Sequence, residues 1–145
     1  CGKTTVGRAL AAALHRPFAD ADELLEQRLG CSCADFLRRA GEDAFRRAET
    51  AVLAELGKRS GCVIATGGGC VTREENYPLL HQNGRILRLR RDLSRLALDG
   101  RPLSAATDLA TLSARREPHY RRFSDGEIDN NGTVAQTVAA ILEAL

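Results

Sequence analysis

A continuous apolar run at residues 62–66 is the feature that most restricts how this chain can fold. Gly61 precedes the run, and three consecutive glycines follow it (Gly67, Gly68 and Gly69, the triple glycine). A strand without polar alternation is buried on both faces, which is typical of a parallel strand in an α/β sheet. Parallel neighbours need long crossover connections, usually helices. The run therefore predicts a parallel sheet with helices packed on its faces.

The rest of the chain alternates helical patterns with short strand patterns, as an α/β fold requires. Further strands are expected at 18–19, 85–89 and 127–129. Helices are expected at 4–15, starting at or just before Lys3, and at 23–29, 32–39, 42–59, 74–82, 92–98, 109–123 and 133–145, with a loop at 100–108. The visible strands are too few for this much helix, so we expect a further central strand just upstream of Cys1.

The length and composition are those of one globular domain. The 145 residues are 43% hydrophobic and 28% charged, with a formal net charge of +2; this argues against disorder and gives no reason to expect a nucleic-acid partner. The chain has no run of about 18 apolar residues and no basic-then-apolar leader, so we expect neither a membrane partner nor export. Five scattered cysteines indicate reduced thiols in a cytoplasmic protein rather than disulfides or a zinc site.

Gly2, Lys3 and Thr4 match the second half of the phosphate loop, G-x-x-x-x-G-K-[ST], and directly begin an apolar-periodic helix. In such a loop, backbone N–H groups and the helix N-terminus hold phosphates. The lysine reaches the β- and γ-phosphates, and the hydroxyl binds magnesium. The triplet is short, and the alternative interpretation is a surface helix that is entered through a glycine.

Asp20 and Asp22 follow the strand candidate at 18–19. In a strand-like turn, residues i and i+2 point to the same side, so two carboxylates would lie beside a phosphate site. One would hold a magnesium-bound water, and the other would orient and deprotonate a hydroxyl. The alternative is structural, because an aspartate here would also cap the helix that begins near Glu23.

Arg46 and Glu49 lie three residues apart on an expected helix and so share a face. Arg46 would hold an anionic substrate group and Glu49 would order it; the alternative is a solvated ion pair of little energetic value. The triple glycine would let a substrate carboxylate or hydroxyl approach backbone N–H groups closely. A plain strand-to-helix turn, which is the alternative there, rarely needs three glycines.

Two arginine-bearing segments complete the candidates. Arg101 begins a segment of small and polar residues. Such a segment would form a mobile lid, whose arginine would neutralise phosphate charge and whose closure would exclude water. Residues 115–122 are locally basic and would bind an anion. The alternatives are an exposed loop for the first segment and a solvated helix face for the second.

Six blocks of the sequence together resemble the shikimate kinase family. They are G-K-T-T-V-G-R (2–8), D-A-D (20–22), G-E-D-A-F-R-R-A-E (41–49), A-T-G-G-G (65–69), R-P-L (101–103) and R-R-E-P-H-Y (115–120). All six occur in the family's order across almost the whole chain. The resemblance implies the three-layer α/β/α fold of nucleoside monophosphate kinases, a P-loop kinase fold with a central parallel sheet of about five strands. It implies one domain over residues 1–145, with a substrate-binding region at 20–60 and a lid at 100–114.

The resemblance also implies a reaction, in which ATP phosphorylates the 3-hydroxyl of shikimate to give shikimate 3-phosphate and ADP, a step of aromatic amino-acid synthesis. Asp22 matches the residue that binds the reacting hydroxyl and serves as base. Arg46 and Arg116 match the arginines that clamp the substrate carboxylate. Gly68 matches a backbone donor to the substrate, and Glu49 the acid that orders this pocket.

On the nucleotide side, Thr4 and Asp20 match the family's magnesium-binding residues, and Arg101 matches a lid arginine that reaches the transferring phosphate. The implied cofactor is Mg²⁺, with ATP as co-substrate. The nucleotide-binding candidates are Gly2, Lys3, Thr4, Thr5, Arg95 and Arg101, with Arg95 assigned by position only. The expected catalytic residues are Lys3, Asp22 and Arg101.

The sequence departs from the family pattern at three places. The first half of the phosphate loop and the strand before it, which the family pattern has ahead of Gly2, are absent from the sequence. Leu37 stands where the family often has a phenylalanine, and the segment between Arg101 and Arg116 is several residues short. A gluconate kinase-like enzyme and a non-catalytic, kinase-like regulatory module are the alternatives to a shikimate kinase. We expect a cytoplasmic monomer that binds shikimate and ATP and neither nucleic acid nor membrane.

Overall fold

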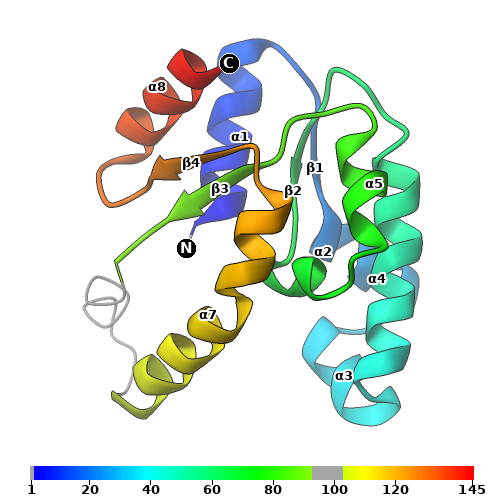
Figure 1. Cartoon of the computed structure of the whole chain (residues 1–145). Coiled ribbons are helices and arrows are strands. Elements are labelled where there is room, and N and C mark those ends of the chain that lie inside the picture. The colour runs from blue at the N-terminus through cyan, green and yellow to red at the C-terminus, as the bar shows by residue number, and fades with distance from the viewer. Residues whose placement is uncertain (1, 93–102) are drawn as a thin grey trace.

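Four short strands in two parallel pairs form the β part of the molecule. The computed structural model describes residues 2–92 and 103–145. The strands are β1 (Phe18–Asp20), β2 (Val63–Ala65), β3 (Leu87–Arg90) and β4 (Gly126–Asp129). β1 pairs with β2, with Phe18 opposite Val63, and β3 pairs with β4, with Leu87 opposite Gly126. Helices lie on both sides of the strands, which is the expected α/β arrangement (Figure 1).

Most of the helices begin and end close to the expected residues. The helices are α1 (Lys3–Leu14), α2 (Ala21–Leu29), α3 (Cys33–Ala40), α4 (Glu42–Leu56), a 3-10 helix η1 (Gly68–Thr72), α5 (Asn76–His81), α7 (Leu103–Phe123) and α8 (Val134–Ala144). The exceptions are α7, which begins earlier, and the 3-10 helix η1, which was not expected. Local chemistry sets several ends. Ser32 caps α3, Thr133 and Gln136 form a capping box at the start of α8, and Gly30 ends α2 in the left-handed conformation.

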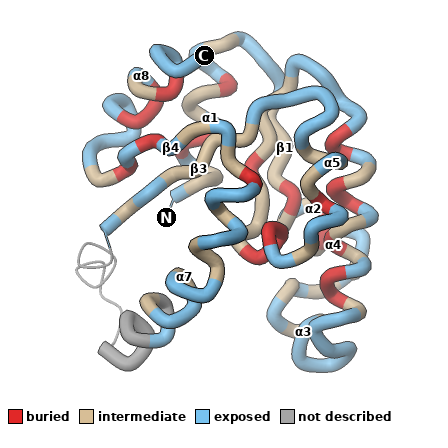
Figure 2. Tube along the Cα trace, in the orientation of Figure 1, coloured by how far each residue is buried: buried red, intermediate tan, exposed pale blue. Residues whose placement is uncertain are grey.

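Two apolar clusters hold the layers together (Figure 2). The larger cluster joins α2, α4, η1 and the end of α7, and its most buried side chains are Leu25, Val52, Leu53, Leu56 and Phe123. The smaller cluster packs α1 and α8 against β4 through Val6, Ile128, Val138 and Ile141. Because the larger cluster includes residues on both sides of the triple-glycine turn, it fixes the position of that turn relative to α2 and α4.

A cavity of about 710 Å³ separates the two strand pairs. Its lining includes Cys62, Ile64 and Thr66 from β2 and its flanks, and Leu87 and Leu89 from β3. Within the described chain, β2 pairs only with β1, and β3 only with β4. Four of the roughly five strands that we expected are therefore described, and the expected central strand is not among residues 2–92 and 103–145.

The expectation of a loop at 100–108 is wrong for residues 103–108. Residues 103–108 begin α7, which continues through Pro118 to Phe123. Leucine and alanine at 103, 105 and 106 have high helix propensity, and this outweighs the small polar residues between them. Most of the helix expected at 92–98 lies outside the described residues. None of the described helices is long and apolar enough to cross a membrane.

Candidate active site

The phosphate-loop candidate begins α1. Gly2 has φ 76°, a left-handed conformation that favours glycine, and Lys3 is the first residue of the helix. Lys3 lines the cavity between the strand pairs. The Thr4 hydroxyl donates a hydrogen bond of 2.6 Å to Asp20 Oδ2, whereas Thr5 is exposed on α1. The start of α1 thus joins a cation and a hydroxyl to the end of β1.

Asp20 caps α2, as the structural alternative expects, and also contacts the start of α1. Its Oδ1 accepts hydrogen bonds from the backbone N–H groups of Asp22 (2.9 Å) and Glu23 (3.2 Å), so Asp20 is the N-cap of α2. Its Oδ2 accepts the Thr4 hydroxyl. A carboxylate and a hydroxyl at this distance are hard oxygen donors, and Mg²⁺ is usually bound through one or two such groups together with water and phosphate. The pair therefore fits the expected magnesium site.

Asp22 lies in the first turn of α2, where it is half-buried. Burial, together with the neighbouring Asp20 carboxylate, raises the pKa of Asp22 above its ordinary value, and the positive charge of Lys3 partly opposes this. A Cβ atom added at Gly67 would lie 2.9 Å from Asp22 Oδ1. Asp22 therefore sits directly against the triple glycine, within the electrostatic reach of Lys3.

Arg46 and Glu49 form a buried ion pair on α4 and not the solvated pair of the alternative interpretation. Arg46 Nη1 donates to Glu49 Oε1 at 2.9 Å, and the two residues are 9% and 3% exposed. Burial raises the pKa of Glu49, and the Arg46 hydrogen bond opposes the rise. Arg46 Nε is buried and has no hydrogen-bond partner in the described chain, although Glu42 Oε1 lies 3.7 Å from it in an ion pair.

The triple glycine is explained by the side chains packed against it. A Cβ at Gly67 would lie 2.9 Å from Asp22, one at Gly68 would lie 3.4 Å from Arg116 Nη1, and one at Gly69 would lie 2.4 Å from Arg46 Nη2. None of the three has a positive φ. The need is thus for space and not for an unusual backbone conformation, and three candidate residues from α2, α7 and α4 meet at one turn.

Alanine at position 69 is expected to displace the Arg46 guanidinium, since the added methyl group would overlap it. We expect Gly69→Ala to lower the free energy of unfolding by about 1–3 kcal/mol, the usual cost of overpacking a filled site. Gly84→Ala is the matched control, because its Cβ would lie 3.8 Å from the nearest atom, Leu80 O. Urea denaturation measures both, and equal losses would contradict this account of the turn.

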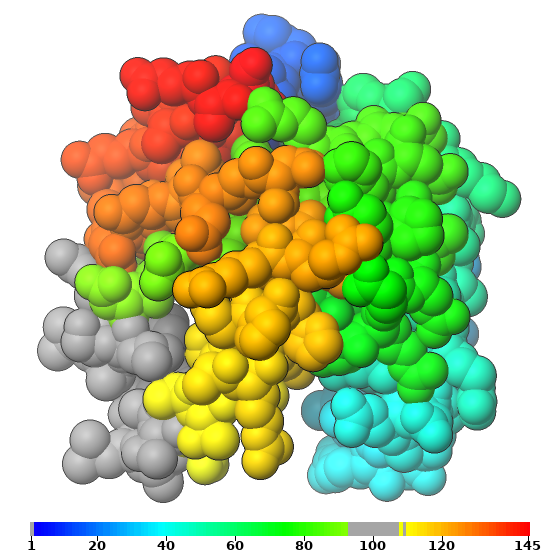
Figure 3. Space-filling view, viewed as in Figure 1, coloured from blue at the N-terminus to red at the C-terminus, as the bar shows by residue number. Residues whose placement is uncertain are grey.

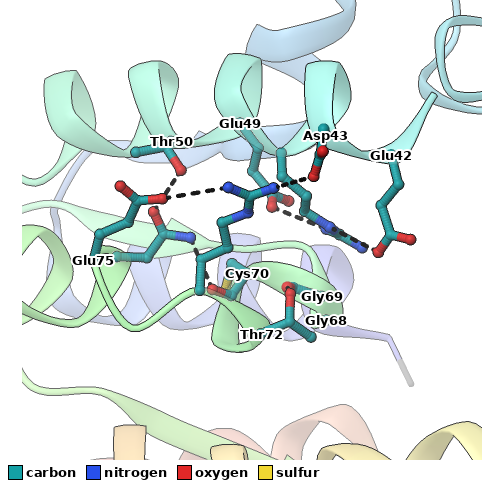
Figure 4. Close-up of polar contacts among 12 residues, drawn as sticks. Glu42, Asp43, Glu49, Thr50, Gly68, Gly69, Cys70, Thr72 and Glu75 are labelled. Carbon is teal, nitrogen blue, oxygen red and sulfur yellow. Dashed lines mark hydrogen bonds and ion pairs between the residues drawn. The ribbon is translucent and has the colours of Figure 1, made fainter. Parts of the chain in front are cut away.

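Further hydrogen bonds fix the turn to α4 (Figure 4). Asn76, which is fully buried, donates to the Cys70 carbonyl at 2.8 Å and accepts from the Thr50 hydroxyl at 2.8 Å. Arg73 donates to Asp43 at 2.8 Å. Because Arg46 and Glu49 lie on the same helix as Thr50, these bonds set the distance between the ion pair and the triple glycine.

Tyr120 is a site residue that sequence reasoning missed. Its hydroxyl donates to the Gly68 carbonyl at 3.2 Å, and it lies one helical turn after Arg116 on α7. The sequence does contain an indication of this, because the i, i+4 spacing of Arg116 and Tyr120 places both side chains on one face of a helix. Arg116, Tyr120 and Gly68 all line the cavity.

The expected site residues are largely brought together, although they do not all line one cavity. Lys3, Gly68 and Arg116 line the cavity, while Asp22 and Arg46 reach the site through their contacts with the triple glycine. On the surface, α7 and α3 form two walls with an opening between them (Figure 3).

Two expected site residues, Arg95 and Arg101, lie outside the described residues. Leu37, at the position of the departure from the family pattern, is 40% exposed on α3.

Comparison with known proteins identifies the family and the fold. A family model described as shikimate kinase matches residues 1–145. The chain belongs to the shikimate kinase family. This match covers the whole sequence and confirms the expected family, and the similarity to solved shikimate kinase structures confirms the expected fold class.

Individual members of the shikimate kinase family agree with this assignment. The chain is 40% identical to the shikimate kinase of Cupriavidus pinatubonensis over 99% of its own length and 80% of that protein, and 42% identical to that of Moorella thermoacetica over 99% and 88%. Among solved structures, the shikimate kinase from Acinetobacter baumannii in complex with shikimate superposes with a TM-score of 0.90 at 34% identity, covering 99% of this chain and 86% of that one. The Aquifex aeolicus shikimate kinase gives 0.84 at 29% identity, covering 99% and 88%.

Proposed function

We propose that this chain transfers the γ-phosphoryl group of ATP to the 3-hydroxyl of shikimate, giving ADP and shikimate 3-phosphate. The observation that carries the proposal is the meeting of Asp22, Arg46 and Arg116 at the triple glycine, beside Lys3. Shikimate has a carboxylate and ring hydroxyls, so an enzyme for it needs anion-binding groups on one side and a base on the other. Membership of the shikimate kinase family and the related structure solved with shikimate support this substrate.

On the acceptor side, Asp22 would hold the reacting hydroxyl and accept its proton. A base is most effective when its pKa is raised toward the working pH, which is the direction of the Asp22 shift. The guanidinium groups of Arg46 and Arg116 would bind the substrate carboxylate, since their planar forks match it in geometry and charge. Glu49 would orient Arg46, and the Gly68 backbone would add a donor.

On the nucleotide side, Lys3 and the N-terminus of α1 would bind the β- and γ-phosphates, together with Gly2 and Thr5. Thr4 and Asp20 would hold Mg²⁺, which when bound neutralises phosphate charge. Phosphoryl transfer depends mainly on alignment and charge stabilisation. Arg95 and Arg101 remain proposed nucleotide contacts, with residues 100–114 as a lid and residues 20–60 as the substrate-binding region of a single domain over 1–145.

The proposal is tested by coupled ADP release from purified protein with shikimate, quinate or gluconate as acceptor. We expect turnover with shikimate. Turnover confined to gluconate would instead favour the gluconate kinase-like alternative, and no turnover with any acceptor would favour a non-catalytic module. The same proposal extends to a cytoplasmic monomer, which light scattering of the purified protein and fractionation of cells test directly.

Alanine at position 116 is expected to weaken shikimate binding and to leave ATP binding largely intact. Hydrogen bonds to a charged group contribute about 1.5–3 kcal/mol, so we expect Arg116→Ala to raise the KM for shikimate about 10- to 150-fold. Arg115→Ala, which removes the exposed neighbouring arginine, is the matched control. Steady-state kinetics with each substrate varied in turn provide the measurement, and an unchanged KM for shikimate would reject Arg116 as a carboxylate ligand.

A further inference from the structure

Arg88 connects the second strand pair to the helix that carries Arg116. It lies on β3, and its side chain is 13% exposed. Its Nη1 and Nη2 donate to the two carboxylate oxygens of Glu117 at 2.9 and 2.5 Å, and Nη1 also donates to Glu127 of β4 at 3.0 Å. A two-point pair of this kind fixes orientation as well as distance. Glu117 is the residue directly after Arg116 on α7.

The same guanidinium also contacts Tyr120. It lies 4.6 Å from the centre of the Tyr120 ring, within the range of a cation–π interaction. The Tyr120 hydroxyl in turn donates to the Gly68 carbonyl. Three side chains, Arg88, Glu117 and Tyr120, therefore form a continuous chain of contacts from β3 through α7 to the triple glycine.

This chain of contacts lies where α7 meets the body of the molecule. Figure 1 shows that the C-terminal half of α7 packs near the strands, while its N-terminal half projects away from them. Phe123, 1% exposed, fixes the last turn in the larger apolar cluster. Rotation of α7 about its axis would move Arg116 away from Gly68, and the paired carboxylate of Glu117 opposes such rotation.

We infer that Arg88, Glu117 and Tyr120 are positioning residues that hold Arg116 against the triple glycine in the orientation that binds the substrate carboxylate. The inference deepens the proposed function and rests on it. The inference concerns binding of the acceptor, shikimate, and not of ATP. In the described hydrogen bonds and ion pairs, none of the three residues contacts Lys3, Thr4 or Asp20. The Arg88 hydrogen bonds hold the pKa of Glu117 at about 2, so the pair stays ionised throughout the pH range of an assay.

The test is a kinetic cycle on the full chain with shikimate and ATP. We expect Glu117→Gln to raise the KM for shikimate about 3- to 30-fold, since small misplacements of a binding group are costly, with the KM for ATP changed less than about twofold. Combined with Arg116→Ala, it should add no further loss, because it acts through Arg116. Glu127→Gln is the matched control: it removes the other Arg88 partner without touching α7, and should leave both KM values unchanged.

Two results would overturn the inference. The first is an active wild-type enzyme in which Glu117→Gln leaves the KM for shikimate unchanged, and the second is a full additional loss in the double variant. A wild-type protein that does not phosphorylate shikimate would overturn the proposed function itself, together with this inference. If Glu117→Gln lowers the folded fraction, Arg88→Lys gives the same readout, because it keeps the charge and removes the two-point geometry.

Discussion

Asp22→Asn is expected to lower kcat for shikimate phosphorylation about 10²- to 10⁴-fold, the usual contribution of a positioned base, while ATP still binds. Asparagine keeps the size and the hydrogen-bonding capacity of the side chain but cannot accept the proton. Glu23→Gln, at the next and exposed position of the same helical turn, should retain normal turnover. Coupled ADP release measures kcat, and calorimetry measures nucleotide binding. Unchanged turnover in Asp22→Asn would reject the assignment of the base.

The raised pKa of Asp22 gives this prediction a pH dependence. Only the ionised carboxylate accepts a proton, so kcat should fall as the pH drops through a pKa above the ordinary 3.8. The effect on stability has the opposite direction. A carboxylate with a raised pKa in the folded state contributes stability below its unfolded pKa, and this is lost as the pH rises through the folded value. Asp22→Asn should therefore be more stable than wild type at neutral pH, with the difference disappearing as the pH falls below the ordinary pKa of 3.8.

Arg46→Ala is expected to lower the free energy of unfolding by about 3–5 kcal/mol, the usual cost of leaving one partner of a buried ion pair alone. Glu49 is 3% exposed, and without Arg46 its carboxyl group would be buried without its cationic partner. The double variant Arg46→Ala/Glu49→Ala should lose less than the sum of the two single losses. Arg47→Ala, at the exposed neighbouring position, should be nearly neutral.

Urea denaturation at two pH values tests the Arg46 prediction. Since Arg46 lowers the pKa of Glu49 and burial raises it, removing the arginine should raise that pKa further. The deficit of Arg46→Ala should then be largest near pH 8 and shrink toward pH 4, where Glu49 takes up a proton. Equal losses in Arg46→Ala and Arg47→Ala would contradict the buried pair.

The sequence predicted those features that depend on local pattern. The apolar run at 62–66 contains β2, and Gly30 and Ser32 lie at the helix ends where capping preferences expect them. The two interpretations of Asp20 could not be ranked from the sequence, because capping and metal binding favour the same residue type. The structure shows that one oxygen of Asp20 caps α2 and that the other accepts the Thr4 hydroxyl.

The features that the sequence could not predict depend on contacts between distant residues. The triple glycine leaves room for Asp22, Arg46 and Arg116, which pack against it from three different helices. Local sequence cannot show such contacts. The Arg88–Glu117 pair joins residues 29 positions apart, and no local pattern in the sequence indicates that the two side chains meet. The expected helix start at 109 is wrong, because α7 begins at Leu103. Small polar residues favour loops on average, but the leucine and alanine residues beside them favour a helix.

The double use of Asp20 has a mechanical consequence. Its two oxygens tie the first turn of α1, where a nucleotide phosphate would rest, to the first turn of α2, which carries Asp22. Under the proposed roles, Asp20 would therefore set the spacing between the bound phosphate and the base.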